Sequence, residues 1–124
     1  MTIKDLVGYQ LISMTEEKIV VQKNGIAYTL MIVEDEGDCC GYNEITAQLY
    51  FDENNLTHNP VITNVKVTSK EVGDANEVEI TFFGEVKVIA ELTSTSSSGS
   101  GWQYGACVSI VCKDIDLNET ISEW

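Results

Sequence analysis

The chain has 124 residues, of which 44 % are hydrophobic and 22 % charged, so it is long enough for one domain with its own core and too apolar for a disordered segment. Twenty acidic residues against seven basic ones give a formal net charge of −13, and all seven basic residues are lysines. A negative electrostatic field repels nucleic acids, and the chain has no arginine to make bidentate phosphate contacts. Direct DNA or RNA binding is therefore disfavoured, and a basic protein partner is favoured. The simpler interpretation of the charge is that it keeps a small β protein soluble.

The start of the chain and the cysteines bear on its compartment. Residues 1–5 contain no basic segment followed by a long apolar run, and no stretch approaches the roughly 18 apolar residues of a membrane span. We therefore expect a soluble, cytoplasmic protein without membrane contact. Four cysteines would allow three disulfide pairings, but in this compartment we expect them to be reduced.

Apolar residues recur at every second position along most of the chain, and Val, Ile, Thr and aromatic residues dominate, which indicates half-buried strands and not helices. We expect a single β domain over residues 1–124. The predicted strands are 7–13, 18–23, 26–33, 44–51, 61–70, 77–83, 86–92 and 102–113. With about eight short strands and no longer repeat, the predicted fold is all-β, an antiparallel β-sandwich or a small barrel.

The clearest unit is a hairpin. Asn24-Gly25 supplies the two positive-φ positions of a type I′ turn, so residues whose numbers sum to 49 should pair across it. This pairing predicts one core face made of Ile19, Val21, Tyr28, Leu30 and Ile32. The opposite face, half exposed or covered by another layer, holds Gln22, Thr29 and Met31.

Later strands are predicted from the same alternation. In residues 44–51 the inward side chains are Ile45, Ala47, Leu49 and Phe51; in 61–70 they are Val61, Thr63, Val65 and Val67; in 86–92 they are Val86, Val88, Ala90 and Leu92. Turns are predicted at 52–60, at 72–76 and at Gly84-Glu85, the last as a turn or bulge. Residues 93–101 are predicted to be a Ser/Thr/Gly loop, and 114–124 a polar C-terminal tail or short helix.

Two adjacent cysteines, Cys39 and Cys40, lie in an acidic turn at residues 34–42. Together with Cys107 and Cys112 they are a candidate zinc set, but zinc ligands are usually two to four residues apart, and Cys107 and Cys112 lie five apart with opposite strand parity. A bridge between the adjacent cysteines is disfavoured because neighbouring Cα atoms are about 3.8 Å apart. We favour a structural role, in which one cysteine packs inward and the other closes the turn, and we expect no metal or cofactor.

Other candidate sites are weaker. Asp35, Glu36 and Asp38 are candidate calcium ligands, but their spacing differs from that of a twelve-residue calcium loop, and a solvated acidic turn is the commoner interpretation. His58, the sole histidine, lies in a polar loop with no nucleophile near it in sequence, so hydrolytic catalysis is disfavoured. Because no acid, base and nucleophile can be placed together, we expect a protein that is not an enzyme.

The segment 96–104 is the more informative candidate. The backbone amides of its Ser/Gly run could hold an anion, and Trp102 and Tyr104 share a strand face on which a base could stack for roughly 1–3 kcal/mol. The alternative is a flexible hairpin tip whose aromatic side chains cover the edge of the core. Across this loop and the acidic turn, the predicted ligand-binding residues are Asp38, Cys39, Tyr42, Ser98, Ser100, Trp102 and Tyr104.

Three pieces of the chain resemble small phage and prophage proteins that carry an Asp-Cys-Cys motif. They are Asp38-Cys39-Cys40 after a hairpin, the strand piece Thr81-Phe82-Phe83, and the Ser/Gly loop with its aromatics at residues 98–104. The likeness covers about residues 38–113, and Gly41 departs from it, since an acidic residue commonly follows the cysteines. The resemblance implies a phage accessory protein that binds and blocks a host defence in the cytoplasm of the host cell.

These observations lead to competing functional hypotheses. The first is a non-enzymatic anti-defence protein of phage type that sequesters a nucleotide-like immune signal between the acidic turn and the Ser/Gly loop; its phosphates would need backbone amides or lysines such as Lys87 and Lys113. The second is an acidic mimic of nucleic acid that inhibits a basic host defence nuclease, in the manner of an anti-CRISPR protein. A minor structural protein of the virion is the third. A homo-oligomer formed by edge pairing is compatible with each.

Overall fold

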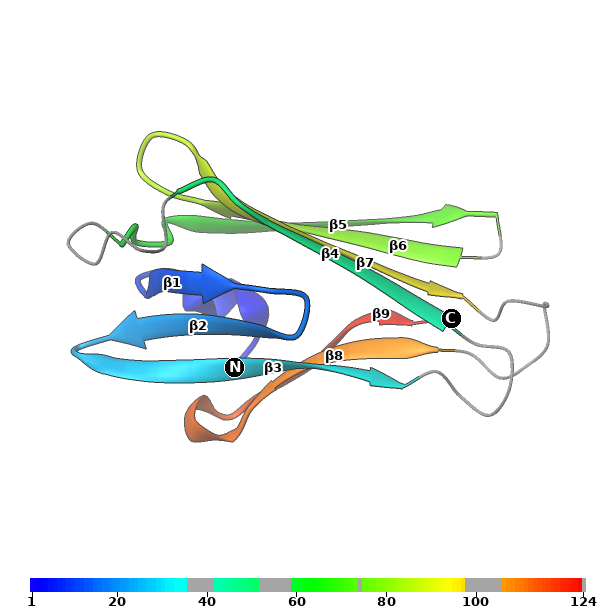
Figure 1. The fold of residues 1–124 in the computed structure, drawn as a ribbon, viewed down its shortest axis with the longest axis horizontal. Helices are drawn as coiled ribbons and strands as arrows, with labels where there is room; N and C mark the ends of the chain where they lie inside the picture. Colours follow the sequence, from blue (N-terminus) through cyan, green and yellow to red (C-terminus); the bar gives the residue numbers. More distant parts are fainter. Residues whose placement is uncertain (36–41, 52–58, 74, 98–105, 124) are drawn as a thin grey trace.

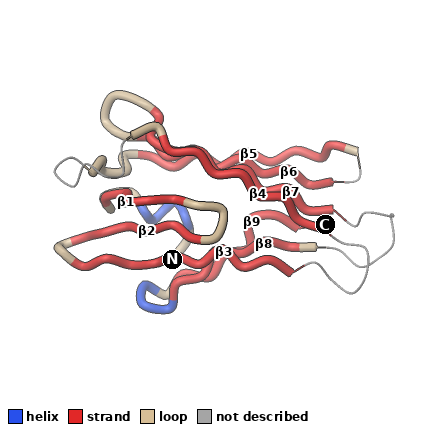
Figure 2. The backbone as a smooth tube through the Cα atoms, in the orientation of Figure 1, coloured by secondary structure: helices blue, strands red, loops and turns tan. Residues whose placement is uncertain are grey.

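The computed structural model describes residues 1–35, 42–51, 59–73, 75–97 and 106–123. Two antiparallel sheets stack on one another as a sandwich (Figure 1; Figure 2). The first sheet has the order β1-β2-β3-β8-β9, with bounds Gln10–Met14, Lys18–Lys23, Ile26–Asp35, Cys107–Cys112 and Leu117–Glu123. The second has the order β4-β7-β6-β5, with bounds Tyr42–Leu49, Val88–Ser97, Ala75–Phe83 and Asn64–Val72. The all-β prediction is confirmed.

Two short 3-10 turns accompany the strands. The first, η1, spans Ile3–Leu6 and begins with a capping box, in which the backbone N–H of Thr2 donates to Asp5 Oδ2 at 2.7 Å. Its Ile3 and Leu6 are buried. The strand predicted at residues 7–13 begins only at Gln10, because the chain turns before it: Gly8 has φ 97° and the N–H of Tyr9 donates to the carbonyl of Leu6 at 3.0 Å. The second, η2, spans Lys113–Ile115.

The predicted hairpin is confirmed in its turn and in its register. Asn24 and Gly25 have φ values of 53° and 78°, as a type I′ turn requires. Ile19 pairs with Leu30 and Val21 with Tyr28. Both sheets contribute to one core, and the largest fully buried side chains are Phe82, Ile3, Leu6, Leu11, Ile19, Leu30, Ile62, Ile80, Ile89, Leu92, Ile110 and Leu117.

The prediction for residues 61–70 is wrong at its start. The strand begins at Asn64, Ile62 is fully buried, and Val61 is 41 % exposed. The cause is a second set of backbone bonds: the N–H of Ile62 donates to the carbonyl of Tyr9 at 2.8 Å. That bond fastens the segment ahead of β5 to the start of β1 and reverses its alternation.

The prediction for residues 86–92 is wrong at Val86, which is 93 % exposed. The N–H of Gly84 donates to the carbonyl of Lys87 at 2.8 Å, so residues 84–87 form the turn between β6 and β7. The register shifts between Phe82 and Phe83, as the predicted turn or bulge at Gly84-Glu85 implies. Val86 therefore lies at the tip of a turn and points away from the core.

Two segments predicted to lack regular structure are strands. Residues 93–97, predicted to begin a low-complexity loop, continue β7 to Ser97. Residues 117–123, predicted to be a tail or a short helix, form β9 and pair with β8. The chain reverses before β9 through Asp116, which has φ 53° and whose N–H donates to the carbonyl of Lys113 at 3.2 Å. Similarly, the 72–76 turn is shorter than predicted, because Val72 already pairs with Ala75.

Candidate functional site

Most of the sequence-predicted ligand residues lie outside the described residues. This holds for Asp38, Cys39, Ser98, Ser100, Trp102 and Tyr104, and equally for the cysteine Cys40, the carboxylate Glu36 and the histidine His58. Tyr42 is described: it is the first residue of β4 and is 47 % exposed.

The strand residues that flank the two predicted loops do lie side by side. Asp35 pairs with Cys107 across β3 and β8, and Tyr42 pairs with Ser97 across β4 and β7. The side chain of Asn43 joins these strands, because its Nδ2 donates to the carbonyls of Asp35 and Cys107, at 3.2 Å each. Both connections therefore leave the sandwich at the same end, which we call the loop end (Figure 1).

Behind Asn43 lies a chain of hydroxyl groups that sequence reasoning missed. Ser96 Oγ donates to Asn43 Oδ1 at 2.7 Å, and Ser122 Oγ lies 2.7 Å from both Ser96 Oγ and Ser94 Oγ. Because each hydroxyl has one proton, Ser122 must donate to Ser96, and Ser94 to Ser122. The three serines are at most 2 % exposed, so this network fastens β9 of one sheet to β7 of the other.

The serine network corrects the functional interpretation of the Ser-rich segment at its first residue. Ser96 was predicted to be the first residue of an anion-binding loop. In the structure it is fully buried, and its hydroxyl donates to Asn43 Oδ1. The signal in the sequence was the alternation of Thr93, Ser94, Thr95 and Ser96 with period two, which is typical of a strand with small polar side chains turned inward.

The two described cysteines occupy opposite faces of β8, as their parity predicts. Cys112 is buried and Cys107 is half-buried, and both thiols are free. Burial raises the pKa of the Cys107 thiol, and the nearby carboxylates Asp35 and Glu123 raise it further. Cys107 therefore stays protonated at neutral pH, which makes it a poor nucleophile and a poor metal ligand.

The outer surface of β4, β7 and β6 carries carboxylates flanked by tyrosines. We call this surface the acidic face; its carboxylates are Glu44, Glu77, Glu79 and Glu91. The register places threonines between them, since Thr95 pairs with both Glu44 and Glu77. Among the described outward residues of these three strands there is no lysine. On neighbouring β5, Lys70 reaches Glu77 Oε1 at 3.7 Å.

Two exposed tyrosines mark the ends of the β4 row. Tyr42 is 47 % exposed and Tyr50 36 %. The Tyr50 hydroxyl donates to Gln48 Oε1 at 3.1 Å, and partial burial followed by the neighbouring Glu91 carboxylate raises the Tyr50 pKa. Tyr50 is therefore a neutral hydrogen-bonding group beside a carboxylate at all physiological pH values.

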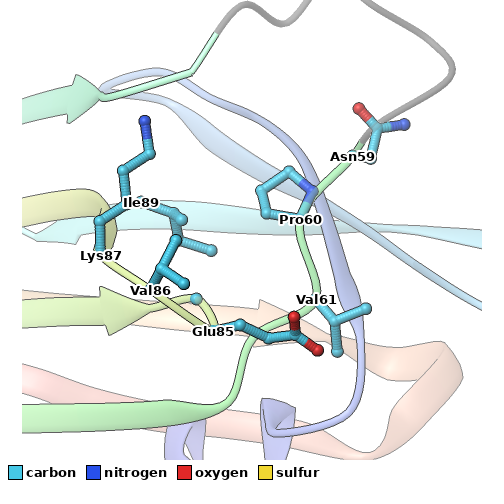
Figure 3. Close-up of a pocket in the computed structure, with 8 residues that line it drawn as sticks. Asn59, Pro60, Val61, Glu85, Val86, Lys87 and Ile89 are labelled. Carbon is cyan, nitrogen blue, oxygen red and sulfur yellow. The ribbon is translucent and has the colours of Figure 1, made fainter.

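A cavity of about 400 Å³ lies at the opposite end of the sandwich, which we call the turn end. It is formed where the segment ahead of β5 meets the β6–β7 turn, and Figure 3 shows the side chains around it. The lining residues are Asn59, Pro60, Val61, Gly84, Glu85, Val86, Lys87 and Ile89. Lys87 is a predicted phosphate ligand, but the sequence predicted no site at this end of the sandwich.

Fold and surfaces together define a small antiparallel β-sandwich domain with an acidic sheet face. A family model described as a domain of unknown function, DUF7448, matches residues 3–110, and the chain belongs to this family. Comparison with curated proteins and with solved structures gave no match. Among the described residues, no helix is long and apolar enough to cross a membrane.

Proposed function

We propose that the protein is a non-enzymatic binding protein that occupies a basic surface of a partner protein with its acidic face. The observation that carries this proposal is the placement of Glu44, Glu77, Glu79 and Glu91 on one sheet surface, between the exposed Tyr42 and Tyr50. The resemblance to phage proteins makes a defence nuclease of the host the class of partner to test first.

The geometry of a sheet suits this task. Outward side chains repeat about every 6.6 Å along a strand and 4.8 Å between strands, so the carboxylates form a fixed array on a flat support. Threonines between them are short and leave the carboxylates prominent. Tyrosine is enriched at protein interfaces because it contributes a large rigid contact with a polar tip. Charge complementarity then steers a cationic partner to the face.

The test is inhibition of DNA cleavage by purified defence nucleases. We expect inhibition that weakens as the salt concentration rises from about 50 to 300 mM. Replacing Glu44 and Glu79 by lysine should raise the half-inhibitory concentration by about tenfold or more. The matched control replaces Glu16 and Asp114 by lysine; both are exposed and lie outside the acidic face, so the same change in net charge should leave inhibition within about twofold. Equal effects of the two double variants would refute a specific role for this face.

A nucleotide-like ligand is the second candidate function, and the placement of the loop stems favours it. Asp35, Tyr42, Ser97 and Cys107 meet around Asn43, so the connections that carry the predicted ligand residues start from neighbouring points. The exposed carboxylates of Asp35 and Glu123 oppose a phosphate there. Calorimetry with cyclic nucleotides and ADP-ribose derivatives tests this candidate, and an absence of heat for the whole panel would eliminate it.

A further inference from the structure

The cavity at the turn end has walls that the backbone holds in place. On one side, the N–H of Leu11 donates to the carbonyl of Pro60 at 2.9 Å and Gln10 Nε2 donates to the carbonyl of Asn59 at 3.4 Å, which fastens this segment to β1. On the other side, Thr63 Oγ1 donates to the carbonyls of Phe83 and Gly84, at 3.1 and 2.8 Å. The cavity is therefore preformed, as ligand sites usually are.

Gly84 sets how closely the turn approaches β7. A Cβ atom at this position would lie 2.8 Å from Ile89 Cγ2, closer than carbon atoms approach in folded proteins. Only glycine allows the turn to pack on Ile89 in this way, so the shape of the cavity depends on a specific residue and not on a generic turn.

One polar atom at the rim lacks a partner. Asn59 Oδ1 is buried, and within the part of the chain that the structure describes it is the one buried side-chain nitrogen or oxygen atom without a hydrogen bond. Buried acceptors in folded proteins are nearly always paired. The Asn59 side chain lines an open cavity of about 400 Å³, so a turn of its amide toward that cavity brings the unpaired Oδ1 to a donor supplied by a ligand.

The remaining lining groups define the rest of that ligand. Pro60 provides an apolar surface between Asn59 and Lys87, which lie on opposite sides of it in Figure 3. Ile89 also lines the cavity, but it is only 1 % exposed and offers no free surface. Lys87 Nζ gives one of its three protons to the carbonyl of Tyr50, at 2.9 Å, which leaves two donors and the charge for a ligand. Val86, at 93 % exposure, leaves an apolar side chain in water at the rim. Glu85 lies on the side of Val61, away from the lysine in this view (Figure 3).

A flat apolar body with a donor at one end and an anionic group at the other fits these three features. Asparagine pairs with adenine through two hydrogen bonds: Oδ1 accepts from the N6 amine and Nδ2 donates to N7. Guanine presents the O6 acceptor in place of that amine, so Asn59 Oδ1 would face another acceptor. Turning the amide to donate to O6 would set Oδ1 against N7, which is also an acceptor.

We propose that this cavity binds an adenine nucleotide, with the base against Pro60, its N6–N7 edge on the Asn59 amide, and its phosphate on Lys87. A volume of about 400 Å³ lies within the usual range for small-molecule sites, roughly 300–1,000 Å³. The site adjoins the Tyr50 end of the acidic face through the Lys87–Tyr50 hydrogen bond, and it places a nucleotide at the end of the sandwich opposite the predicted loops.

The experiment is a calorimetric titration of the full chain with AMP, GMP and adenosine, with amide NMR shifts recorded for AMP. We expect AMP to bind at least about fivefold more tightly than GMP and to shift the amide resonances of Asn59, Val61 and residues 84–89. Lys87→Ala should weaken AMP about fivefold and leave adenosine within about twofold. Lys4→Ala removes the same charge at an exposed position outside the cavity and should change neither affinity.

Three outcomes would overturn the proposal. The first is no heat from AMP at millimolar concentration with folded wild-type protein. The second is AMP binding that Lys87→Ala and Lys4→Ala weaken equally. The third is AMP binding that shifts residues flanking 36–41 and 98–105 and leaves Asn59, Val61 and residues 84–89 unmoved, which would assign the nucleotide to the loop end. The dispersed NMR spectrum of each variant reports that it is folded.

Discussion

The two ends of the sandwich handle buried polar groups in opposite ways. At the loop end, Asn43 and three serines form a continuous chain in which every side-chain proton has an acceptor. At the turn end, Asn59 leaves its Oδ1 buried and unpaired beside a cavity. The same side chain, asparagine, is thus a structural link at one end and an incomplete recognition group at the other. Burial does not distinguish these two roles, because both asparagines are partly buried. They differ in whether every polar side-chain atom has a hydrogen-bond partner.

The largest effect should come from breaking the satisfied network. Asn43→Leu leaves the Ser96 hydroxyl without its acceptor and removes the two bonds to the carbonyls of Asp35 and Cys107. We expect the free energy of unfolding to fall by about 3 kcal/mol, measured by urea denaturation. Ser109→Ala is the control, because its hydroxyl lies in a 3.3 Å contact with Thr120 at the surface, and it should cost no more than about 0.5 kcal/mol.

Gly84→Ala should have the next largest effect. Its Cβ would meet Ile89 Cγ2 at 2.8 Å, so the turn must move away from β7. We expect a loss of about 1–3 kcal/mol in the free energy of unfolding. Val86→Ala, at the exposed tip of the same turn, should be nearly neutral. If Gly84→Ala lowered the free energy of unfolding no more than Val86→Ala does, the close contact between Gly84 and Ile89 would be contradicted.

The same substitution at the other asparagine sharpens the comparison. Asn59→Leu removes a buried acceptor that has no partner among the described residues, so it should leave stability unchanged or increase it by up to about 1 kcal/mol. It should also abolish the discrimination of AMP from GMP. Destabilisation of Asn59→Leu comparable with that of Asn43→Leu would mean that the Asn59 amide is part of the fold's own hydrogen bonding.

The smallest effect concerns the Cys107 thiol. Burial and the carboxylates of Asp35 and Glu123 raise its pKa in the folded protein, so the folded state holds this proton more tightly than the unfolded state. Stability from this group is present below the unfolded pKa and is lost as the pH rises through the folded pKa. Glu123→Gln should move the pH profile of Cys107 alkylation, followed by peptide mass spectrometry, to lower pH. An unchanged profile would contradict the carboxylate contribution.

The sequence predicted correctly those strands in which hydrophobic residues alternate with polar ones and a strong turn sequence follows. Asn24-Gly25 fixed both the turn and the register of β2 and β3. It failed where small or polar residues were turned inward: Ser94 and Ser96 in β7, and Ser122 in β9, are buried through hydrogen bonds that join strands distant in sequence. The alternation of hydrophobic residues does not predict buried positions that are occupied by serine.

The candidate sites divide in the same way. Tyr42 could be singled out from sequence because it flanks an unusual turn, and the shared end of the two predicted loops follows from the strand pairing. The cavity could not be predicted, since it depends on the bond between Ile62 and Tyr9 that reverses the alternation after Pro60. Lys87 was predicted as a phosphate ligand, together with Lys113, but for a ligand held between the acidic turn and the Ser/Gly loop, and Asn59 was predicted only as part of a turn.

The most direct test of the difference between the two ends is the effect of AMP on the unfolding of wild type and Asn59→Leu. A ligand that binds only the folded state adds about 2.7 kcal/mol at one hundred times its Kd, so saturating AMP should raise the urea midpoint of the wild type by a corresponding amount. The Asn59→Leu midpoint should respond much less to AMP, and GMP should have a smaller effect than AMP on the wild type. Equal stabilisation of both proteins by AMP would contradict the assignment of the unpaired asparagine to ligand recognition.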